Sequence, residues 1–240
     1  HHTPGRVAVI AGAQVSRDDA RAELEALRDA LGAVVVTAPD ARDVSPGALV
    51  TGVMGHPDVG DAIGNCEVCL LVGTRLPVTA RVGIEHALTS TLMLSIGAET
   101  PFVPTVHVRS DDLRWSLAQL TALVRDRPRS ASVALSHNVL QPPAHDGPGV
   151  RYSDAMAVLD EVLPGDADVV VDAGNTGAAA IHLLPVRRDG RFVVALGMGG
   201  MGFSFGAAIG VCFARGRRTV VLAGDGSFFM HGMEIHTAVQ

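Results

Sequence analysis

Three glycine-rich turns are the part of this sequence whose residue types and spacing could do chemistry. They span residues 172–177, 197–202 and 224–227, and each follows an apolar run that is typical of a β-strand. Loops that follow parallel strands gather at the carboxyl edge of a sheet, where ligands bind. Glycine lets backbone N–H groups approach a phosphate closely, and the helix that follows adds a favourable dipole. The turns therefore predict a site for a phosphate-bearing ligand.

Asp225 lies between two glycines in the third turn, which reads Gly224-Asp225-Gly226-Ser227. A bare carboxylate would repel a diphosphate, so this arrangement favours a divalent cation between the two. Mg²⁺ takes oxygen ligands and commonly combines one or two protein groups with phosphate oxygens and water. Ser227 is expected either to cap the next helix or to offer its N–H to the phosphate. We therefore predict Asp225 as a metal ligand.

The second turn also fits a dinucleotide-binding pattern. Gly197, Gly199 and Gly202 satisfy G-x-G-x-x-G after the apolar run 192–196, and Asp225 ends the next strand at a suitable separation. Two features weaken this alternative, because the acid lies inside a glycine turn and because the third turn has no role in that fold. A nicotinamide oxidoreductase is thus one alternative, and a non-catalytic homologue that keeps the fold is another.

The elements that must position these turns alternate between strands and helices. The expected strands are short apolar runs at 7–10, 33–36, 68–72, 91–96, 105–108, 169–171, 192–196 and 219–223. The expected helices cover 16–31, with Ser16 as N-cap and Gly32 at the end, then 111–124, 152–163 with Ser153 as cap, 203–215 and 232–240. This alternation implies parallel sheets covered by helices on both faces. The predicted fold class is α/β, with two three-layer domains.

The expected domain boundaries follow from a change in composition. Residues 127–150 are rich in proline, serine and glycine, which is typical of a linker. The first domain is therefore expected to span 1–126 and the second 151–240. The second pattern stops at Gln240 inside an expected helix, and His1-His2 resembles the remnant of a tag. We expect the second domain to be truncated and the chain to be part of a longer protein.

Composition excludes several classes of function. The 240 residues carry a formal net charge of −6 and no lysine, so nucleic-acid binding, a lysine Schiff base and a Walker P-loop are not expected. Cys66 and Cys69 form a lone C-x-x-C that runs into an apolar segment, which favours a buried strand edge over a metal or redox site. No apolar run approaches the ~20 residues of a membrane helix, and no secretory signal opens the chain. We expect no membrane partner and a cytoplasmic location.

Two segments together resemble thiamin-diphosphate-dependent enzymes, and most closely the acetolactate (acetohydroxyacid) synthase large-subunit group. The run from Gly224 to Phe228, followed by Met230 and Glu234, is similar to the start of the family's diphosphate and metal motif. The runs 199–203 and 207–210 are similar to the segment that holds the aminopyrimidine. Residues 5–124 resemble the family's central domain. The resemblance implies a central domain followed by an incomplete diphosphate-binding domain.

The resemblance implies a role for each turn in binding thiamin diphosphate and Mg²⁺. Asp225 would be a ligand of the Mg²⁺ that bridges the diphosphate, and Met201 would be the apolar wedge that bends the cofactor. The implied cofactor-binding residues are Gly174, Asn175, Thr176, Gly199, Met201, Gly224, Asp225, Gly226 and Ser227. The Asn175-Thr176 pair replaces the Gly-Gln-His form usual in acetolactate synthases, which leaves the substrate open.

The resemblance also implies the reaction and the partners. A 2-keto acid such as pyruvate would be decarboxylated and joined to an acceptor, and a 2-keto-acid decarboxylase of the same family is the alternative. The family's glutamate lies in an N-terminal domain that this chain does not contain, so we expect no catalytic residue here and no turnover by this chain alone. A homodimer or homotetramer and a small regulatory subunit are the implied partners. Flavin is not expected, because residues 94–97 lack the acids of the family's flavin-associated element.

Overall fold

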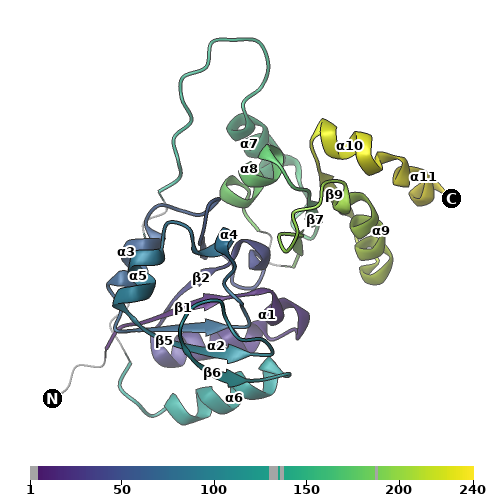
Figure 1. The fold of residues 1–240 in the computed structure, drawn as a ribbon. Coiled ribbons are helices and arrows are strands. Elements are labelled where there is room, and N and C mark those ends of the chain that lie inside the picture. Colours follow the sequence, from purple (N-terminus) through teal and green to yellow (C-terminus); the bar gives the residue numbers. More distant parts are fainter. Residues whose placement is uncertain (1–4, 130–134, 136–137, 187–188) are drawn as a thin grey trace. The chain divides into compact units, whose positions relative to one another are not determined.

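The computed structural model describes residues 5–129, 135, 138–186 and 189–240. The chain divides into two compact units, His1–Asn138 and Val139–Gln240, and each is considered by itself. The point of division lies within the expected linker 127–150, of which residues 130–134 and 136–137 are outside the described part. Figure 1 shows the order of helices and strands along both units.

The first unit is built on a parallel sheet with strand order β3-β2-β1-β4-β5-β6. In the central pairs, Ile10 lies between Val36 and Leu71. All three side chains are fully buried, which explains why these strands read as continuous apolar runs. The strands are β1 (Val7–Ala11), β2 (Val34–Thr37), β3 (Leu49–Val50), β4 (Val68–Val72), β5 (Leu92–Gly97) and β6 (Val106–Arg109).

Helices cover both faces of this sheet, with α2 and α6 packed together on one face and α3 and α5 on the other (Figure 1). The Asp112 side chain caps α6, because its carboxylate accepts a hydrogen bond from the Trp115 N–H at 3.1 Å. The helical segments are α1 (Ala13–Arg17), α2 (Arg21–Leu31), η1 (Pro39–Ala41), α3 (Val59–Gly64), α4 (Val78–Arg81), α5 (Glu85–Ser90) and α6 (Leu113–Val124). The unit is a three-layer α/β structure, as predicted.

The helix predicted over 16–31 is wrong at its start. Ser16 lies inside α1, and the backbone then turns at Asp19, which has a φ of 53°. The Ser16 hydroxyl accepts a hydrogen bond from the Arg21 guanidinium at 2.7 Å, and Arg21 also pairs with Asp43 at 2.7 Å. These contacts hold Ser16 at a bend between two helices instead of at an N-cap. The end of the helix is confirmed, since Gly32 is a left-handed C-cap with a φ of 65°.

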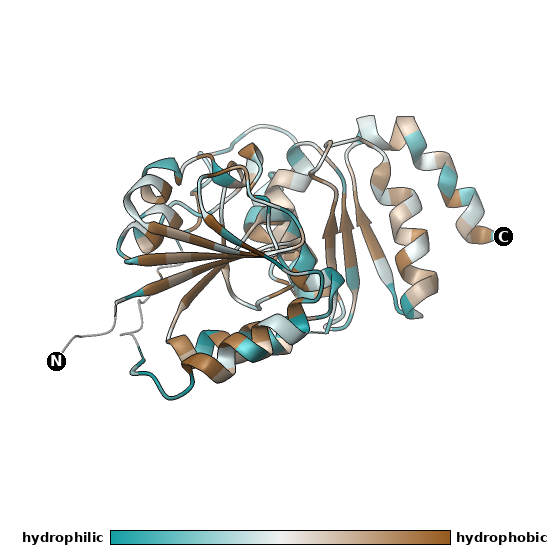
Figure 2. Ribbon diagram, turned by 60° about the horizontal axis from the view of Figure 1, so that its bottom comes forward, coloured by the Kyte–Doolittle hydropathy of each residue, from teal (hydrophilic) through white to brown (hydrophobic). Residues whose placement is uncertain are grey.

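The second unit is built on a three-stranded parallel sheet with order β8-β7-β9. Its strands are apolar except for Asp168 and Thr219 at their amino ends, and α8 and α9 lie on opposite faces (Figure 2). The strands are β7 (Asp168–Val171), β8 (Phe192–Val194) and β9 (Thr219–Leu222). The helical segments are α7 (Tyr152–Val162), α8 (Asn175–Leu183), α9 (Phe203–Arg215), α10 (Asp225–His231), η2 (Gly232–Glu234) and α11 (Ile235–Val239). The predicted parallel α/β class is confirmed here as well.

One expectation for a helix start in this unit is wrong. Ser153 does not cap α7, whose N-cap is Arg151, because the Arg151 guanidinium binds the Asp154 carboxylate in the first turn at 2.8 and 2.9 Å. The helix expected over 232–240 is present as η2 and α11, and it is preceded by α10, whose N-cap is the extended residue Gly224. The Gly-Asp-Gly-Ser segment is therefore the first turn of a helix. No helix in the described part of the chain is long and apolar enough to cross a lipid bilayer.

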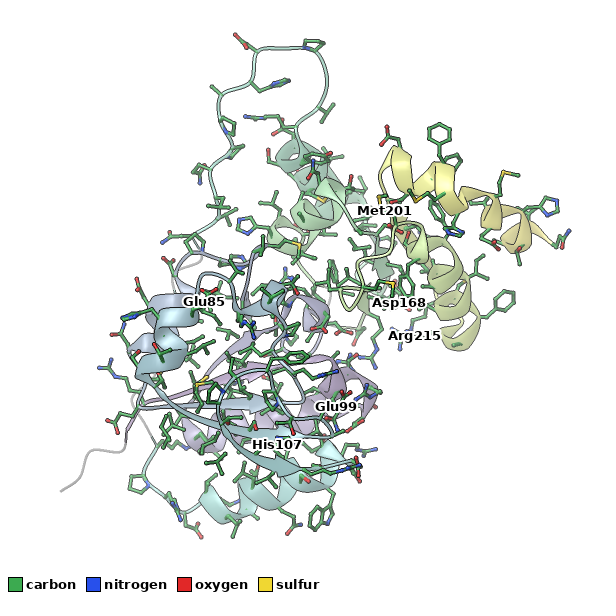
Figure 3. The ribbon with its side chains drawn as sticks, viewed as in Figure 1. Glu85, Glu99, His107, Asp168, Met201 and Arg215 are labelled. Atoms are coloured by element: carbon green, nitrogen blue, oxygen red, sulfur yellow. The ribbon has the colours of Figure 1, made fainter. Side chains whose placement is uncertain are left out.

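A buried ion pair anchors the amino end of the sheet in the second unit. Asp168 is fully buried, and its carboxylate accepts hydrogen bonds from the Arg215 Nε at 2.6 Å and the Arg191 N–H at 2.7 Å. Figure 3 shows Asp168 beside Arg215, at the end of α9 that is remote from Met201. These contacts join the starts of β7 and β8 to the end of α9. They fix the sheet at the edge opposite the glycine turns.

Candidate functional site

The three glycine turns all lie at the carboxyl edge of the sheet in the second unit, as predicted. Each one leads directly into a helix, and the N-cap residue is a glycine in every case: Gly174 before α8, Gly202 before α9 and Gly224 before α10. The φ angles of Gly174 and Gly202 are 106° and 88°, which a side chain would oppose. Glycine at these two positions therefore sets the direction in which α8 and α9 leave the sheet.

The carboxylate of Asp172, at the end of β7, joins the turns to one another. Its Oδ1 accepts a hydrogen bond from the Gly202 N–H at 2.9 Å, and its Oδ2 accepts one from the Ser204 N–H at 2.9 Å. The Ser227 hydroxyl in α10 donates to Oδ1 at 2.7 Å, as does the Ala173 N–H at 2.9 Å. Asp172 is only 2% exposed. One buried side chain thus connects the first turn to the second and the third.

Asp172 remains ionised in this environment. Burial by itself would raise the pKa of the carboxyl, but hydrogen bonds from Ser204, Ser227 and Gly202 outweigh it and lower the pKa below 3.8. Several donors directed at one carboxylate favour its charged form. The anion in turn satisfies backbone N–H groups at the start of α9, which have no partner within the helix. Asp172 therefore acts as the cap of α9 from a distant position in the chain.

This contact decides against the dinucleotide-binding alternative. In that fold the pyrophosphate lies at the helix N-terminus that follows the G-x-G-x-x-G turn. Here the N–H groups of Gly202 and Ser204 at that N-terminus are occupied by the Asp172 carboxylate. The phosphate site predicted from the glycine turns therefore does not include the start of α9. At the start of α10 the Gly226 N–H donates to the Asp225 carboxylate at 2.8 Å.

The first and third turns face each other with open space around their glycines. A Cβ added to Gly174 would meet no atom within 4 Å, and one added to Gly224 would lie 3.8 Å from the Thr176 Oγ1. Asn175 and Asp225 are exposed at the first positions of α8 and α10. The Asp225 carboxylate accepts a hydrogen bond from the Gly226 N–H at 2.8 Å. The structure thus brings the predicted diphosphate and metal residues to one place.

The second turn presents Met201 and a glycine-rich backbone. Gly199 has a φ of 67°, and a Cβ added to it would meet no atom within 4 Å. The Met201 side chain is 43% exposed, although methionine is among the residue types most often buried in a core. Gly202, in contrast, lies against His231 of α10. The turn is therefore anchored at Gly202, whereas Gly199 and Met201 remain accessible.

Two family models match the chain. The thiamine pyrophosphate enzyme central domain matches residues 4–110, and the C-terminal TPP binding domain of the same enzymes matches residues 172–240. The chain belongs to the thiamine pyrophosphate enzymes. The resemblance drawn from the glycine turns is thereby confirmed, and all nine predicted cofactor residues lie inside the second match.

Curated relatives and a solved structure agree with this assignment. The isozyme 2 large subunit of acetolactate synthase from Escherichia coli is 34% identical over 78% of this chain and 35% of its own length. The acetolactate synthase large subunit of Lactococcus lactis is 31% identical over 82% of this chain and 29% of its own length. The X-ray structure of a Mycobacterium smegmatis protein assigned to the thiamin diphosphate-dependent enzymes shares the fold, with a TM-score of 0.68 and 24% identity over 98% of this chain and 48% of that one. The chain thus spans about a third of the length of these curated relatives.

The donors at the carboxyl edge fit the cofactor that the two matched domains imply, thiamine pyrophosphate. In the described part of the chain, no group of three or more His, Cys, Asp and Glu side chains could hold a metal. Asp225 alone would leave most of a Mg²⁺ coordination shell to phosphate oxygens and water, which is how Mg²⁺ usually binds. The open glycines at 174 and 199 leave space for a ligand against the backbone. These residues therefore suit a cofactor that brings its own anionic metal ligands.

Two histidines and Cys69 have structural roles, which for Cys69 agrees with the prediction. The His56 Nδ1 accepts a hydrogen bond from the Val50 N–H at 3.0 Å, and the His107 Nδ1 bonds the Ser95 hydroxyl at 2.8 Å. Cys69 is fully buried in β4, and burial raises the pKa of its thiol to about 12. A thiol that stays protonated is neither a nucleophile nor a metal ligand.

Sequence reasoning missed the part played by Asp172. The sequence marks it only as the residue at which a strand ends, and its donors lie 30, 32 and 55 positions away. One signal could have found it. An acid at the carboxyl end of the central strand must find donors or a cation if a diphosphate binds nearby. Of Asp172 and Asp225, the latter is better placed for a cation, because it lies between two glycines. The remaining acid, Asp172, would then require donors from the neighbouring turns.

Proposed function

We propose that the protein binds thiamin diphosphate and Mg²⁺ at the carboxyl edge of the second unit's sheet, and that it acts on 2-keto acids as an acetolactate-synthase-like enzyme. The observation that carries this proposal is the meeting of three glycine turns around an exposed carboxylate, Asp225, with a buried one, Asp172, holding the turns together. The names of the relatives support the choice of reaction.

Each turn has its own task in this proposal. Asp225 is the protein ligand of Mg²⁺, because its exposed carboxylate lies at the start of α10 beside Gly224 and Gly226. The backbone N–H groups at Gly174, Asn175, Thr176, Gly224 and Ser227 bind the diphosphate. The Gly226 N–H already donates to the Asp225 carboxylate at 2.8 Å. The Ser227 hydroxyl takes no part, since it donates to Asp172 at 2.7 Å.

The second turn positions the organic part of the cofactor. Backbone groups of Gly199 and Met201 bind the aminopyrimidine, and the exposed Met201 side chain supports the cofactor from below. When bound, thiamin diphosphate supplies the electron sink that lets a 2-keto acid lose CO₂. The contribution of this chain is to bind, orient and hold the cofactor.

The wider assembly is also part of the proposal. Both curated relatives are described as large subunits, which supports a small regulatory partner for this protein. We further propose a homodimer or homotetramer in the cytoplasm, with the glutamate that acts on the aminopyrimidine supplied by a domain outside this chain. A 2-keto-acid decarboxylase of the same family is distinguished by its product, which is an aldehyde instead of an acetohydroxy acid.

Calorimetric titration with thiamin diphosphate, with and without Mg²⁺, tests the proposal. We expect binding that requires Mg²⁺ and that is lost in Asp225→Asn, which removes the charge but keeps the shape. Asp154→Asn is the matched control, because Asp154 is also an exposed acid in the first turn of a helix in the same unit. Binding that is independent of Mg²⁺, or equal loss in both variants, contradicts the assignment of Asp225. Failure of the wild-type protein to bind at all contradicts the proposed function.

A further inference from the structure

Asp172 contacts all three glycine turns at once, although it is not among the residues that we assign to the cofactor or the metal. It follows β7 at the first turn, receives N–H groups of Gly202 and Ser204 from the second, and receives the Ser227 hydroxyl from the third. We propose that Asp172 is a positioning residue for cofactor binding: its carboxylate assembles the turns before the cofactor arrives. This inference rests on the proposed function.

The chemistry of the contact requires a carboxylate. Gly202, Ser204 and Ser227 all offer hydrogens, so the group between them must accept on both of its oxygens. An asparagine of the same shape would turn an NH₂ group toward one of these donors. Because the site is buried, a donor left without an acceptor is costly and the turn would move to reach water. Asp172→Asn therefore releases the turn while leaving its volume unchanged.

A purely structural role is the competing explanation, and the same strand contains the residue that separates the two. Asp168 at the other end of β7 is also buried and also accepts a backbone N–H and a side-chain donor. Its donors, Arg191 and Arg215, lie at the amino edge of the sheet and not in the turns. Loss of Asp168 should weaken the unit without disturbing the cofactor site, whereas loss of Asp172 should disturb the site directly.

The effect on binding follows from the fraction of molecules with assembled turns. If only that fraction binds the cofactor, the apparent Kd rises in proportion as the fraction falls. Asp172→Asn removes the negative charge from all three hydrogen bonds and the acceptor from at least one of the donors. We expect Asp172→Asn to weaken binding of thiamin diphosphate by about tenfold or more, and Asp168→Asn by less than about twofold. Ser227→Ala, which removes one of the donors, should lie between them.

The test measures two quantities in the wild-type protein and in Asp172→Asn and Asp168→Asn. The first is the Kd for thiamin diphosphate with Mg²⁺ by calorimetry. The second is amide hydrogen exchange of the cofactor-free protein over residues 197–205, where we expect about tenfold faster exchange in Asp172→Asn only. This second readout does not depend on any cofactor. It reports whether the Gly202 and Ser204 amides have lost their acceptor.

The outcomes separate this inference from the proposed function. Unchanged exchange over 197–205 in Asp172→Asn overturns the positioning role, whether or not the cofactor binds. Equal weakening of binding in Asp172→Asn and Asp168→Asn also overturns it, since general destabilisation would then be the cause. If the wild-type protein binds no thiamin diphosphate while exchange changes as expected, the proposed function fails and Asp172 is left as a structural residue, which overturns its role in cofactor binding.

Discussion

Gly202 is a position at which a single methyl group should damage the second unit through two separate effects. Its φ is 88°, where a residue with a side chain is strained by about 1–2 kcal/mol. An added Cβ would also lie 2.8 Å from the Cβ and 2.9 Å from the Cγ of His231, so a backbone-proximal part of that side chain must shift. Overpacking of this kind costs about 1–3 kcal/mol. We expect Gly202→Ala to lower the free energy of unfolding by about 2–5 kcal/mol.

The control is Gly199→Ala in the same turn. Its φ is 67° but its Cβ would meet nothing within 4 Å, so only the backbone strain of about 1–2 kcal/mol applies. In the double variant Gly202→Ala/His231→Ala the contacts with the imidazole ring are removed and only the contact with the Cβ of residue 231 remains. The loss should therefore be smaller than the sum of the two single losses by about 1–3 kcal/mol.

Urea unfolding, monitored by hydrogen exchange of the β7 peptide in the second unit, measures these changes in the free energy of unfolding. If Gly202→Ala and Gly199→Ala are equally destabilised, the contact with His231 has no cost and the reasoning fails. Additivity of Gly202→Ala and His231→Ala to within about 0.3–0.5 kcal/mol would refute it in the same way. Exchange over β1 in the first unit provides the internal reference in each variant.

Two further predictions concern the protonation of Asp172 and the reactivity of the cysteines. Because the pKa of Asp172 is lowered in the folded protein, its charge stabilises the fold above the ordinary value of 3.8, and this stabilisation is lost as the pH falls through the lowered value. The gap in unfolding free energy between wild type and Asp172→Asn should therefore narrow on acidification from about pH 6 to about pH 3, and a constant gap would contradict the assignment. For the cysteines, Cys212 is exposed whereas Cys66 and Cys69 are buried, and burial raises the pKa of both buried thiols, that of Cys69 to about 12. A thiol reagent should titrate one group quickly in the native protein and all three after denaturation, and three fast native reactions would show that β4 is not buried as described.

The strands of both sheets could be predicted because burial on both faces leaves a strong local signal. The run Val68–Val72 forms β4 and Val169–Val171 lies in β7, and both are apolar because helices cover each side of a parallel strand. The helix over Phe203–Arg215 was likewise predictable, since its residues favour a helix and the C-cap glycine at 216 favours its end there. Where local sequence and tertiary contacts agree, the prediction holds.

The failures occur where distant residues decide the local structure. The bend at Asp19 depends on Arg21 reaching Asp43, which lies 22 positions away from that arginine. Strand β3 has only two residues, Leu49–Val50, too few for any periodic pattern. In the candidate site the glycine turns could be found from their composition, but the contact of Asp172 with Ser227 joins residues 55 positions apart. Only the parallel order of β7 and β9 brings them together.

Two acids at the same edge of one sheet differ in how their negative charges are satisfied. Asp172 and Asp225 follow β7 and β9, which are adjacent and parallel. Asp172 is 2% exposed and is surrounded by protein donors, so its charge is satisfied within the fold. Asp225 is exposed, and its carboxylate accepts the N–H of its neighbour Gly226, which leaves further acceptor capacity on its two oxygens. If Asp172 were exposed and Asp225 buried, the start of α9 would lose its cap. Under the proposed function, the exposed acid would also face the cofactor's phosphates without a cation. Burial therefore separates the two acids: Asp172 is held by protein donors, and Asp225 is the acid that the proposed function gives to a cation.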